Sequence, residues 1–256
     1  MAYTISWDEV GQKYYETGVR QGVLYKMVTS GLDAGTYGAG VPWNGLTSVS
    51  ETPSGAEETA LYADDQKYLS LYSAEELGGT IEAYTYPDEW AECDGSAEVA
   101  TGVMIGQQPR VGFGMCYRTV LGNDLLNENY SYKLHLLYNA KASPSEKSYE
   151  TINDSPSAIT FSWEYKTTPV PIPDTDYKPT ALIVIDASKA DPTKLAALEE
   201  ILYGNGTTDP SLPSPARVME IMGTVAPTGA TGTTGTTGST GEEDPDDGNE
   251  EGTSQP

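Results

Sequence analysis

Short runs in which apolar and polar residues alternate recur through most of the first 190 residues of this 256-residue chain. Side chains of a β-strand point alternately to the two faces of its sheet, so this period of two predicts strands with one buried face. Residues 82–89 are typical, because they alternate and then stop at Pro87, which lacks the N–H needed to continue a ladder. The pattern predicts a mainly β protein.

Turn-forming residues separate these runs, at Asn44-Gly45, Gly78-Gly79, 122–124 and Ser143-Pro144. The predicted strands cover residues 19–28, 47–51, 67–72, 80–86, 99–105, 110–121, 130–140, 159–168 and 180–186. A Gly-rich stretch from Gly31 to Gly40 predicts a long mobile loop after the first of them.

Two helices are predicted beside the strands. A short one begins at Pro87 and ends by Gly95. A longer one over 191–204 has Asp191 as its N-cap, proline at the first helical position, one apolar stripe, and a glycine at its end. Strands with one or two flanking helices indicate an all-β or α+β β-sandwich or barrel with long Gly-rich loops.

The chain divides near residue 223. Beyond it, glycine recurs at every third position from 229 to 241 without a proline inside the repeat, which indicates a flexible linker rather than collagen. The acidic stretch that follows cannot bury apolar area and is expected to be disordered. We therefore expect a β-sandwich domain over 1–223, and a Thr/Gly linker with a disordered acidic tail over 224–256.

The composition limits the partners. The formal net charge is −24, from 14 basic and 38 acidic residues, and seven of the acids lie in the last fifteen residues, so the body carries about −17. Clustered basic residues, which electrostatic binding of nucleic acid requires, are not seen. Tyrosine (18) far outnumbers phenylalanine (2), which suits half-exposed faces and subunit contacts. The first residues do not read as a signal peptide and no apolar run is long enough for a bilayer, so we expect no membrane association.

Residues that carry chemistry are sparse. We expect Cys93 and Cys116 to be buried thiols, and His135, the single histidine, to be a half-buried strand residue. The carboxylates Asp88, Glu89 and Glu57-Glu58 are formal candidates for glycoside hydrolysis, but solvated faces explain them better. Trp43, Trp90 and Trp163 are expected to pack under the sheet rather than stack a sugar. We therefore predict no catalytic residue, metal or cofactor.

Taken together, the motifs resemble the major tail protein family of long, non-contractile-tailed bacteriophages that infect Gram-positive hosts. No single motif is specific, but their order and number are, over roughly residues 3–205. The matching stretches are Gly11–Val19, Gly22–Tyr25, Trp43–Thr47, Pro53–Glu57, Glu82–Glu89, Cys93–Gly95, Gly106–Gln108, Tyr117–Thr119, Gly122–Asp124, Ala142–Glu146, Asn153–Pro156 and Thr167–Val170.

The resemblance implies a tail tube subunit, a structural virion protein assembled in the host cytoplasm. Related proteins close into six-membered rings that stack into a hollow tube, through which the phage DNA passes without specific binding. The implied partners are further copies of the chain, the tape-measure protein, and the tail terminator and distal tail proteins. Long loops bridge the rings; residues 29–45 and 51–66 are the candidates here, in particular Gly31, Tyr37, Trp43, Asn44, Gly55, Glu57, Tyr62 and Asp64.

Simple dimensions agree with this expectation. If six subunits each give four strands to one barrel, about 4.8 Å per strand makes a circumference of about 115 Å and a backbone diameter of about 37 Å. That leaves room for a DNA duplex roughly 20 Å across. An acidic lining would repel DNA over a screening length of about 8 Å and let it slide.

Two other classes remain open. A cell-surface or carbohydrate-binding β-sandwich is the alternative, favoured by the Tyr and Trp content and by a Thr/Gly stretch that resembles a glycosylated stalk. A glycosidase-type enzyme comes third, because only the abundance of carboxylates favours it.

Overall fold

One antiparallel sheet organises the chain, for which a computed structural model describes residues 4–152, 158–173 and 175–223. Within these residues the sheet has eight strands in the order β2-β1-β9-β10-β11-β6-β3, with β12 beside β10. They are β1 (Tyr14–Lys26), β2 (Val41–Trp43), β3 (Leu46–Gly55), β6 (Glu75–Ala83), β9 (Phe113–Asn123), β10 (Asn127–Ala142), β11 (Phe161–Thr167) and β12 (Leu182–Asp186). The predicted mainly β class is confirmed.

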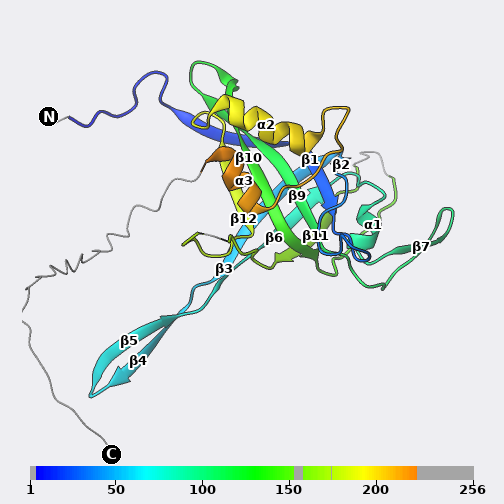
Figure 1. Cartoon of the computed structure of the whole chain (residues 1–256), viewed down its shortest axis with the longest axis horizontal. Helices are drawn as coiled ribbons and strands as arrows, with labels where there is room; N and C mark the ends of the chain where they lie inside the picture. The colour runs from blue at the N-terminus through cyan, green and yellow to red at the C-terminus, as the bar shows by residue number, and fades with distance from the viewer. Residues whose placement is uncertain (1–3, 153–157, 174, 224–256) are drawn as a thin grey trace, which may run out of the picture. The chain divides into compact units, whose positions relative to one another are not determined.

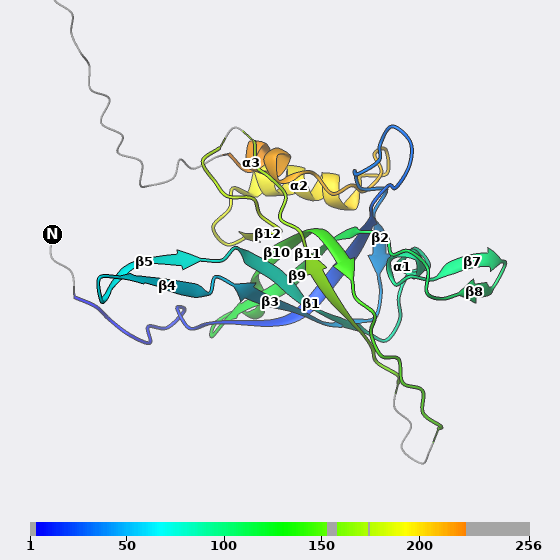
Figure 2. The same ribbon diagram turned by 90° about the horizontal axis from the view of Figure 1, so that it is seen from below.

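The sheet curls back on itself. β2 and β3 stand at the two ends of the strand order, yet they follow each other in the chain and are joined by the turn at Asn44-Gly45. Gly45 has a φ of 74°, and a Cβ there would lie 2.8 Å from the Thr85 side chain. Only glycine fits this turn readily, and the turn brings the two ends of the sheet together (Figures 1 and 2).

β10 is the strand that the others share. One of its edges pairs with β9, from Ser131 to Ala140. Its other edge pairs first with β12, over Lys133–Leu137, and then with β11, over Ala140–Ala142. The sheet splits at Asn139, which has a φ of 47° and whose side chain donates to the Thr168 carbonyl at 3.0 Å.

Two separate cores cover the two faces of this sheet. Alternation along β10 sends Leu137 and Ala140 into the curl, and Leu134 and Leu136 to the opposite face. The inner core also holds Trp43, Trp90, Trp163, Phe113, Met115, Ile81 and Tyr165. The helix-side core holds Tyr25, Cys116, Tyr138, Leu195, Leu198, Leu202, Leu212 and Val218. The expectation that three tryptophans pack under the sheet is confirmed.

Helices α2 (Pro192–Tyr203) and α3 (Pro215–Met222) form a layer over the helix-side core (Figure 2). The predicted cap of α2 is confirmed, because Asp191 accepts hydrogen bonds from the Thr193 and Lys194 amides at 2.9 and 3.1 Å. α1 (Trp90–Cys93) is the predicted short helix. The sequence analysis missed α3, although Ser214 caps it and Pro215 opens it.

Two hairpins leave the body as arms: β4 (Glu58–Ala63) with β5 (Gln66–Tyr72), and β7 (Ala97–Ala100) with β8 (Val103–Ile105). Figure 1 shows them at opposite ends, the first in cyan and the second in green. The predicted single strand over 99–105 is therefore wrong, because Thr101-Gly102 is a turn. The loop expected over 51–66 is also wrong, because most of it is strand.

The Gly-rich stretch after β1 is tied back to the body. The Val28 amide donates to the Thr36 carbonyl at 2.9 Å, and the Gly38 amide to the Lys26 carbonyl at 2.8 Å. The Gly40 amide donates to the Pro210 carbonyl at 2.8 Å. These bonds make the stretch a turn-rich excursion with fixed ends rather than one long free loop.

Both cysteines are free buried thiols, as expected. The described residues up to 223 belong to one compact unit. The linker and acidic tail expected over 224–256 lie outside the described residues. Among the residues that are described, no helix has the length and apolar content needed to cross a membrane.

Gly79 provides a test of how closely β3, β6 and β11 pack. A Cβ at this position would lie 1.9 Å from the Ser50 carbonyl oxygen and 2.6 Å from the Tyr165 hydroxyl. We expect Gly79→Ala to lower the free energy of unfolding by about 1–3 kcal/mol, as overpacking does, measured by urea denaturation. Gly106→Ala is the control, because its Cβ would meet no atom within 4 Å; equal stability of the two variants would contradict this packing.

Candidate interaction surfaces

The β4–β5 arm continues the ribbon that β3 and β6 begin. The ribbon bends where Gly55 and Ala56 adopt φ values of 88° and 54°. Beyond the bend, the Ser73 amide donates to the Glu57 carbonyl at 3.1 Å and the Glu57 amide to the Ser73 hydroxyl at 3.0 Å. The tip is a tight turn at Asp64 and Asp65, both with positive φ. The arm is thus a defined hairpin with two unpaired edges.

One face of this arm is apolar and uncovered. The register pairs Leu61 with Leu69, and Thr59 with Leu71, so all three leucines project from the same face. Their exposed fractions are 42%, 39% and 54%. An isolated two-stranded hairpin has no second layer to cover such side chains. We call Leu61, Leu69 and Leu71 the leucine face.

The opposite face of the arm is polar and acidic. Glu58 accepts hydrogen bonds from Lys67 and Ser70 across the hairpin, and Tyr62 and Tyr72 are about 70% exposed (72% and 68%). Residues 57–72 contain four carboxylates against one lysine. The arm therefore joins one apolar face to an excess of negative charge.

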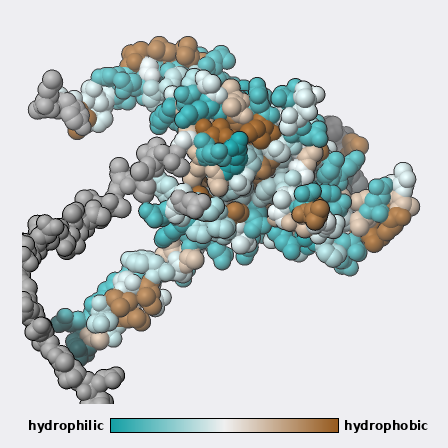
Figure 3. All heavy atoms as spheres, in the orientation of Figure 1, coloured by the Kyte–Doolittle hydropathy of each residue, from teal (hydrophilic) through white to brown (hydrophobic). Residues whose placement is uncertain are grey.

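The β7–β8 arm also has an apolar face, formed by Ala97, Ala100, Val103 and Ile105. Val103 and Ile105 are 51% and 42% exposed. The single charge in the arm is Glu98, which accepts a hydrogen bond from the Gly102 amide at 2.8 Å. We call these four residues the small apolar face. Figure 3 shows hydrophobic side chains gathered on both arms.

The N-terminal segment, residues 4–13, is a third uncovered element. Trp7 and Val10 are 77% and 76% exposed. The segment is anchored where the Gly11 amide donates to Asp124 at 3.0 Å and the Asn123 side chain donates to the Gly11 carbonyl at 3.3 Å. It therefore leaves the body at the Tyr14 end of β1, carrying an exposed indole.

The structure separates the loop residues expected to bridge subunits. Gly55, Glu57, Tyr62 and Asp64 lie together on the β4–β5 arm, and Asn44 is exposed in the β2–β3 turn, whereas Gly31 lies in the tied-back excursion. Trp43 is not a surface loop residue, and that expectation is wrong, while Tyr37 lies half-buried in the same stretch as Gly31. Trp43 lies in β2 with 3% exposure, and the Tyr37 hydroxyl accepts a hydrogen bond from the Asn139 amide at 2.8 Å, which holds its ring against the helix-side core.

His135 belongs to a polar cluster at one end of the inner core. Its ring stacks on Tyr117 with centroids 4.7 Å apart, and Nδ1 lies 2.9 Å from Glu51 Oε1. Tyr117 also donates to Glu51, while Nε2 lies 3.1 Å from the Thr119 hydroxyl. At 8% exposure the ring is buried. The cluster ties β3, the root of the β4–β5 arm, to β9 and β10.

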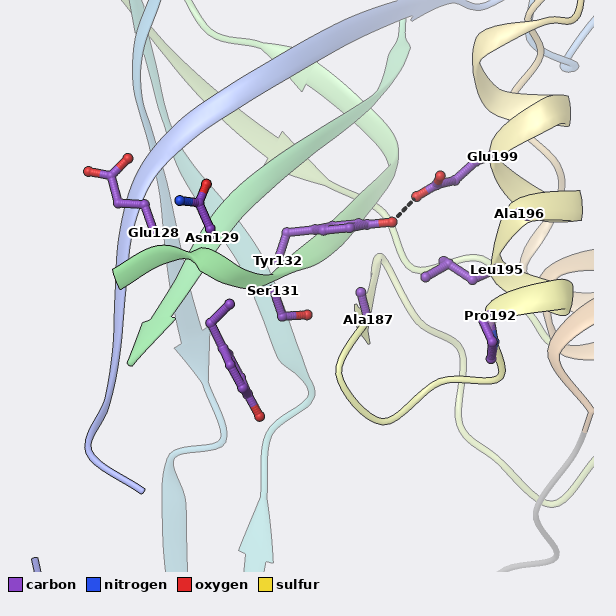
Figure 4. Close-up of a pocket in the computed structure, with 10 residues that line it drawn as sticks. Glu128, Asn129, Ser131, Tyr132, Ala187, Pro192, Leu195, Ala196 and Glu199 are labelled. Carbon is purple, nitrogen blue, oxygen red and sulfur yellow. Dashed lines mark hydrogen bonds between the residues drawn. The ribbon is translucent and has the colours of Figure 1, made fainter. Parts of the chain in front are cut away.

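A groove of about 530 Å³ lies between β10 and α2 (Figure 4). On its wall the Tyr132 hydroxyl donates to Glu199 at 2.5 Å, and Arg118 pairs with Glu199 at 2.7 Å. The Arg118 guanidinium lies 4.3 Å from the centre of the Tyr132 ring and 5.0 Å from that of Tyr203. The charges of Arg118 and Glu199 are therefore paired, and their contacts hold α2 against the sheet.

Neither a metal site nor a reactive thiol is seen among the residues that the structure describes. Within residues 4–152, 158–173 and 175–223, no three His, Cys, Asp or Glu side chains come together in a way that could hold a metal ion. Burial raises the pKa of the Cys93 thiol to about 12 and that of Cys116 to about 11, which makes both poor nucleophiles at neutral pH.

Sequence reasoning missed the β7–β8 arm as a surface. The available signal is Thr101-Gly102, a turn dipeptide inside the apolar run that predicts one strand over 99–105. No protein-family model matches the chain, and a search of the curated proteins finds no match. The uncovered surfaces of the two arms are therefore the features that bear on function.

Replacing Glu51 tests the polar cluster. Hydrogen bonding from His135, and then from Tyr117, holds the pKa of the Glu51 carboxyl below its usual value against the effect of burial. A carboxyl with a depressed folded-state pKa stabilises fully above its unfolded-state pKa of about 4.3, and this stabilisation is lost as the pH falls through the folded-state pKa.

We therefore expect Glu51→Gln to be less stable than the native chain by about 1–2 kcal/mol at pH 6, with a difference that shrinks towards pH 3. Chemical denaturation at several pH values measures this difference. Glu76→Gln, at an exposed position on the adjacent strand, is the control and should change little. A Glu51→Gln difference that stays constant from pH 6 to pH 3 would contradict the assignment.

Proposed function

We propose that this chain is a structural tail tube subunit, which assembles with further copies into stacked hexameric rings that enclose a channel for phage DNA. The observation that carries the proposal is the pair of arms at opposite ends of one body, each with an uncovered apolar face. Exposed apolar faces and free strand edges mark association surfaces. A chain with such surfaces at both ends is suited to extend an assembly in two directions.

The size of the arms favours many weak contacts over one strong one. A stable two-protein interface buries about 800 Å² on each partner, which is more than a face of three or four half-exposed aliphatic side chains provides. An assembly in which every copy makes contacts at both ends gains affinity from multivalency. The tape-measure, tail terminator and distal tail proteins are the proposed partners at the ends of the tube.

The outer face of β3, β6 and β11 is the surface we propose for the channel lining. It presents hydroxyl and acidic side chains such as Ser50, Thr80, Glu82 and Glu164, with Lys166 at one edge. Within these described strands, no large hydrophobic side chain is exposed. Such a face offers DNA neither apolar contacts nor a basic cluster, so the duplex would slide. A tube reconstruction with Lys and Arg dominating the channel would contradict this lining.

A carbohydrate-binding module is less well supported. Stacking of a sugar on tryptophan would need an exposed indole, but Trp43, Trp90 and Trp163 are each 3% exposed or less and contact one another in tilted or edge-to-face geometry in the inner core. Trp7 is exposed, but it lies on an extended segment rather than in a built site.

Assembly of the purified protein is the direct test. We expect sedimentation to show large species whose fraction rises with protein concentration, and electron microscopy to show rings or tubes. The matched variant replaces residues 57–72 with a short Gly-Ser turn between β3 and β6; it should fold, because no core residue is removed, but it should assemble poorly. A native chain that stays monomeric at all concentrations and binds glycans would overturn the proposal.

Deletion of residues 224–256 gives a second expectation. The arms and the channel-lining strands all lie before residue 224, so the truncated chain should assemble as the full chain does. Sedimentation of the two proteins side by side measures this. Loss of assembly in the truncated chain would instead make the C-terminal segment an assembly element.

A further inference from the structure

We propose that the leucine face of the β4–β5 arm in one copy packs against the small apolar face of the β7–β8 arm in a second copy. This inference rests on the proposed function, because it requires the chain to assemble with itself. It goes further by naming the two surfaces that meet.

The two faces belong to different copies because they leave opposite ends of one body. The root of the β4–β5 arm is the end of β3 where Glu51 contacts Tyr117 and His135. The β7–β8 arm follows α1, whose Trp90 packs on Phe113 with ring centroids 4.9 Å apart. Phe113 pairs with Lys26 at the far end of β1. Figures 1 and 2 show the resulting separation of the arms.

The shapes of the two faces are complementary. Three leucines project from one hairpin, and the other presents Ala97 and Ala100 on the strand opposite Ile105 and Val103. Stacked sheets lie about 10 Å apart, a spacing that large side chains opposite small ones can fill without voids. Two hairpins stacked in this way would form a small sandwich that covers both apolar faces.

Charge argues against the alternative in which two β4–β5 arms pair with each other. Residues 57–72 carry four carboxylates against Lys67 alone, so a symmetric pair would bring two acidic arms together. The β7–β8 arm carries only Glu98, which Gly102 already binds. A nearly neutral receiving surface therefore suits the acidic arm better than a second copy of itself does.

The contact is heterologous, because each copy gives one face at one end and accepts the other face at its opposite end. Repeated contacts of this type build a closed ring or an open stack rather than a dimer. Because the leucine face lies beyond the bend at Gly55 and Ala56, on a hairpin outside the main sheet, it can reach the next copy.

Cysteine cross-linking tests the pairing in the full-length chain. The variant carries Leu69→Cys and Val103→Cys together, and mild oxidation should give a ladder of covalent multimers on a denaturing gel. Cys93 and Cys116 are fully buried, so the native chain should give no cross-linked product and serves as the negative control. Each single variant is a control and should give little product. Tyr72→Cys with Val103→Cys is the matched control, since Tyr72 lies on the opposite face of the arm.

The outcomes separate the two proposals. A ladder in the Leu69/Val103 variant at least ten times stronger than in the Tyr72/Val103 variant supports the pairing. Dimers from Leu69→Cys alone, at a comparable yield, would mean that like arms meet, and would overturn it. Rings or tubes by electron microscopy without the ladder would also overturn it, while leaving the proposed function intact. A chain that neither assembles nor cross-links would overturn both.

Discussion

The division of one sheet between two cores is the constraint on which the structure depends. Successive residues of β10 enter different cores, so Leu136 packs under the helices while Leu137 packs inside the curl. A shift of one residue in the pairing would exchange the two sets. The registers of β9, β11 and β12 on this strand therefore also fix where the helices lie and how the sheet closes.

With both faces of β10 buried, the apolar residues that remain outside are concentrated on extensions. On the body itself, polar contacts connect the elements at the edges of the two cores. Examples are the Arg118–Glu199 pair beneath α2 and the Glu51–His135 pair at the root of the β4–β5 arm. The arms have no corresponding cover within the described chain. This contrast is the observation that supports the assembly we propose.

Local signals were enough for part of this fold. The Asp191 cap, Pro192 and Gly204 fixed α2 because each acts within one helical turn, and alternation located most strands. The arms were harder to predict. In residues 51–66 the strand pairing is local, but glycine and acidic residues resemble a loop, and no core contact reveals the hairpin. Trp43 was assigned to a loop because Asn44-Gly45 follows it, yet long-range packing against Trp90 and Trp163 draws it inside.

The pairing of the sheet could not be read from the sequence at all. The order of β11 and β12 on β10 depends on a split at Asn139, which does not alter the alternation of apolar and polar residues. The β2–β3 turn closes the sheet only because the other strands pair in an order that the sequence does not show. The resemblance to tail proteins supplied an expected architecture, but not which hairpin faces are left uncovered.

The two thiols bear on how the fold responds to the redox state of its surroundings. Cys93 and Cys116 lie in different cores and neither is bonded to the other, so no covalent link in the described body forms or breaks with the surroundings. The stability of the described body therefore owes nothing to a disulfide that a reducing medium could break.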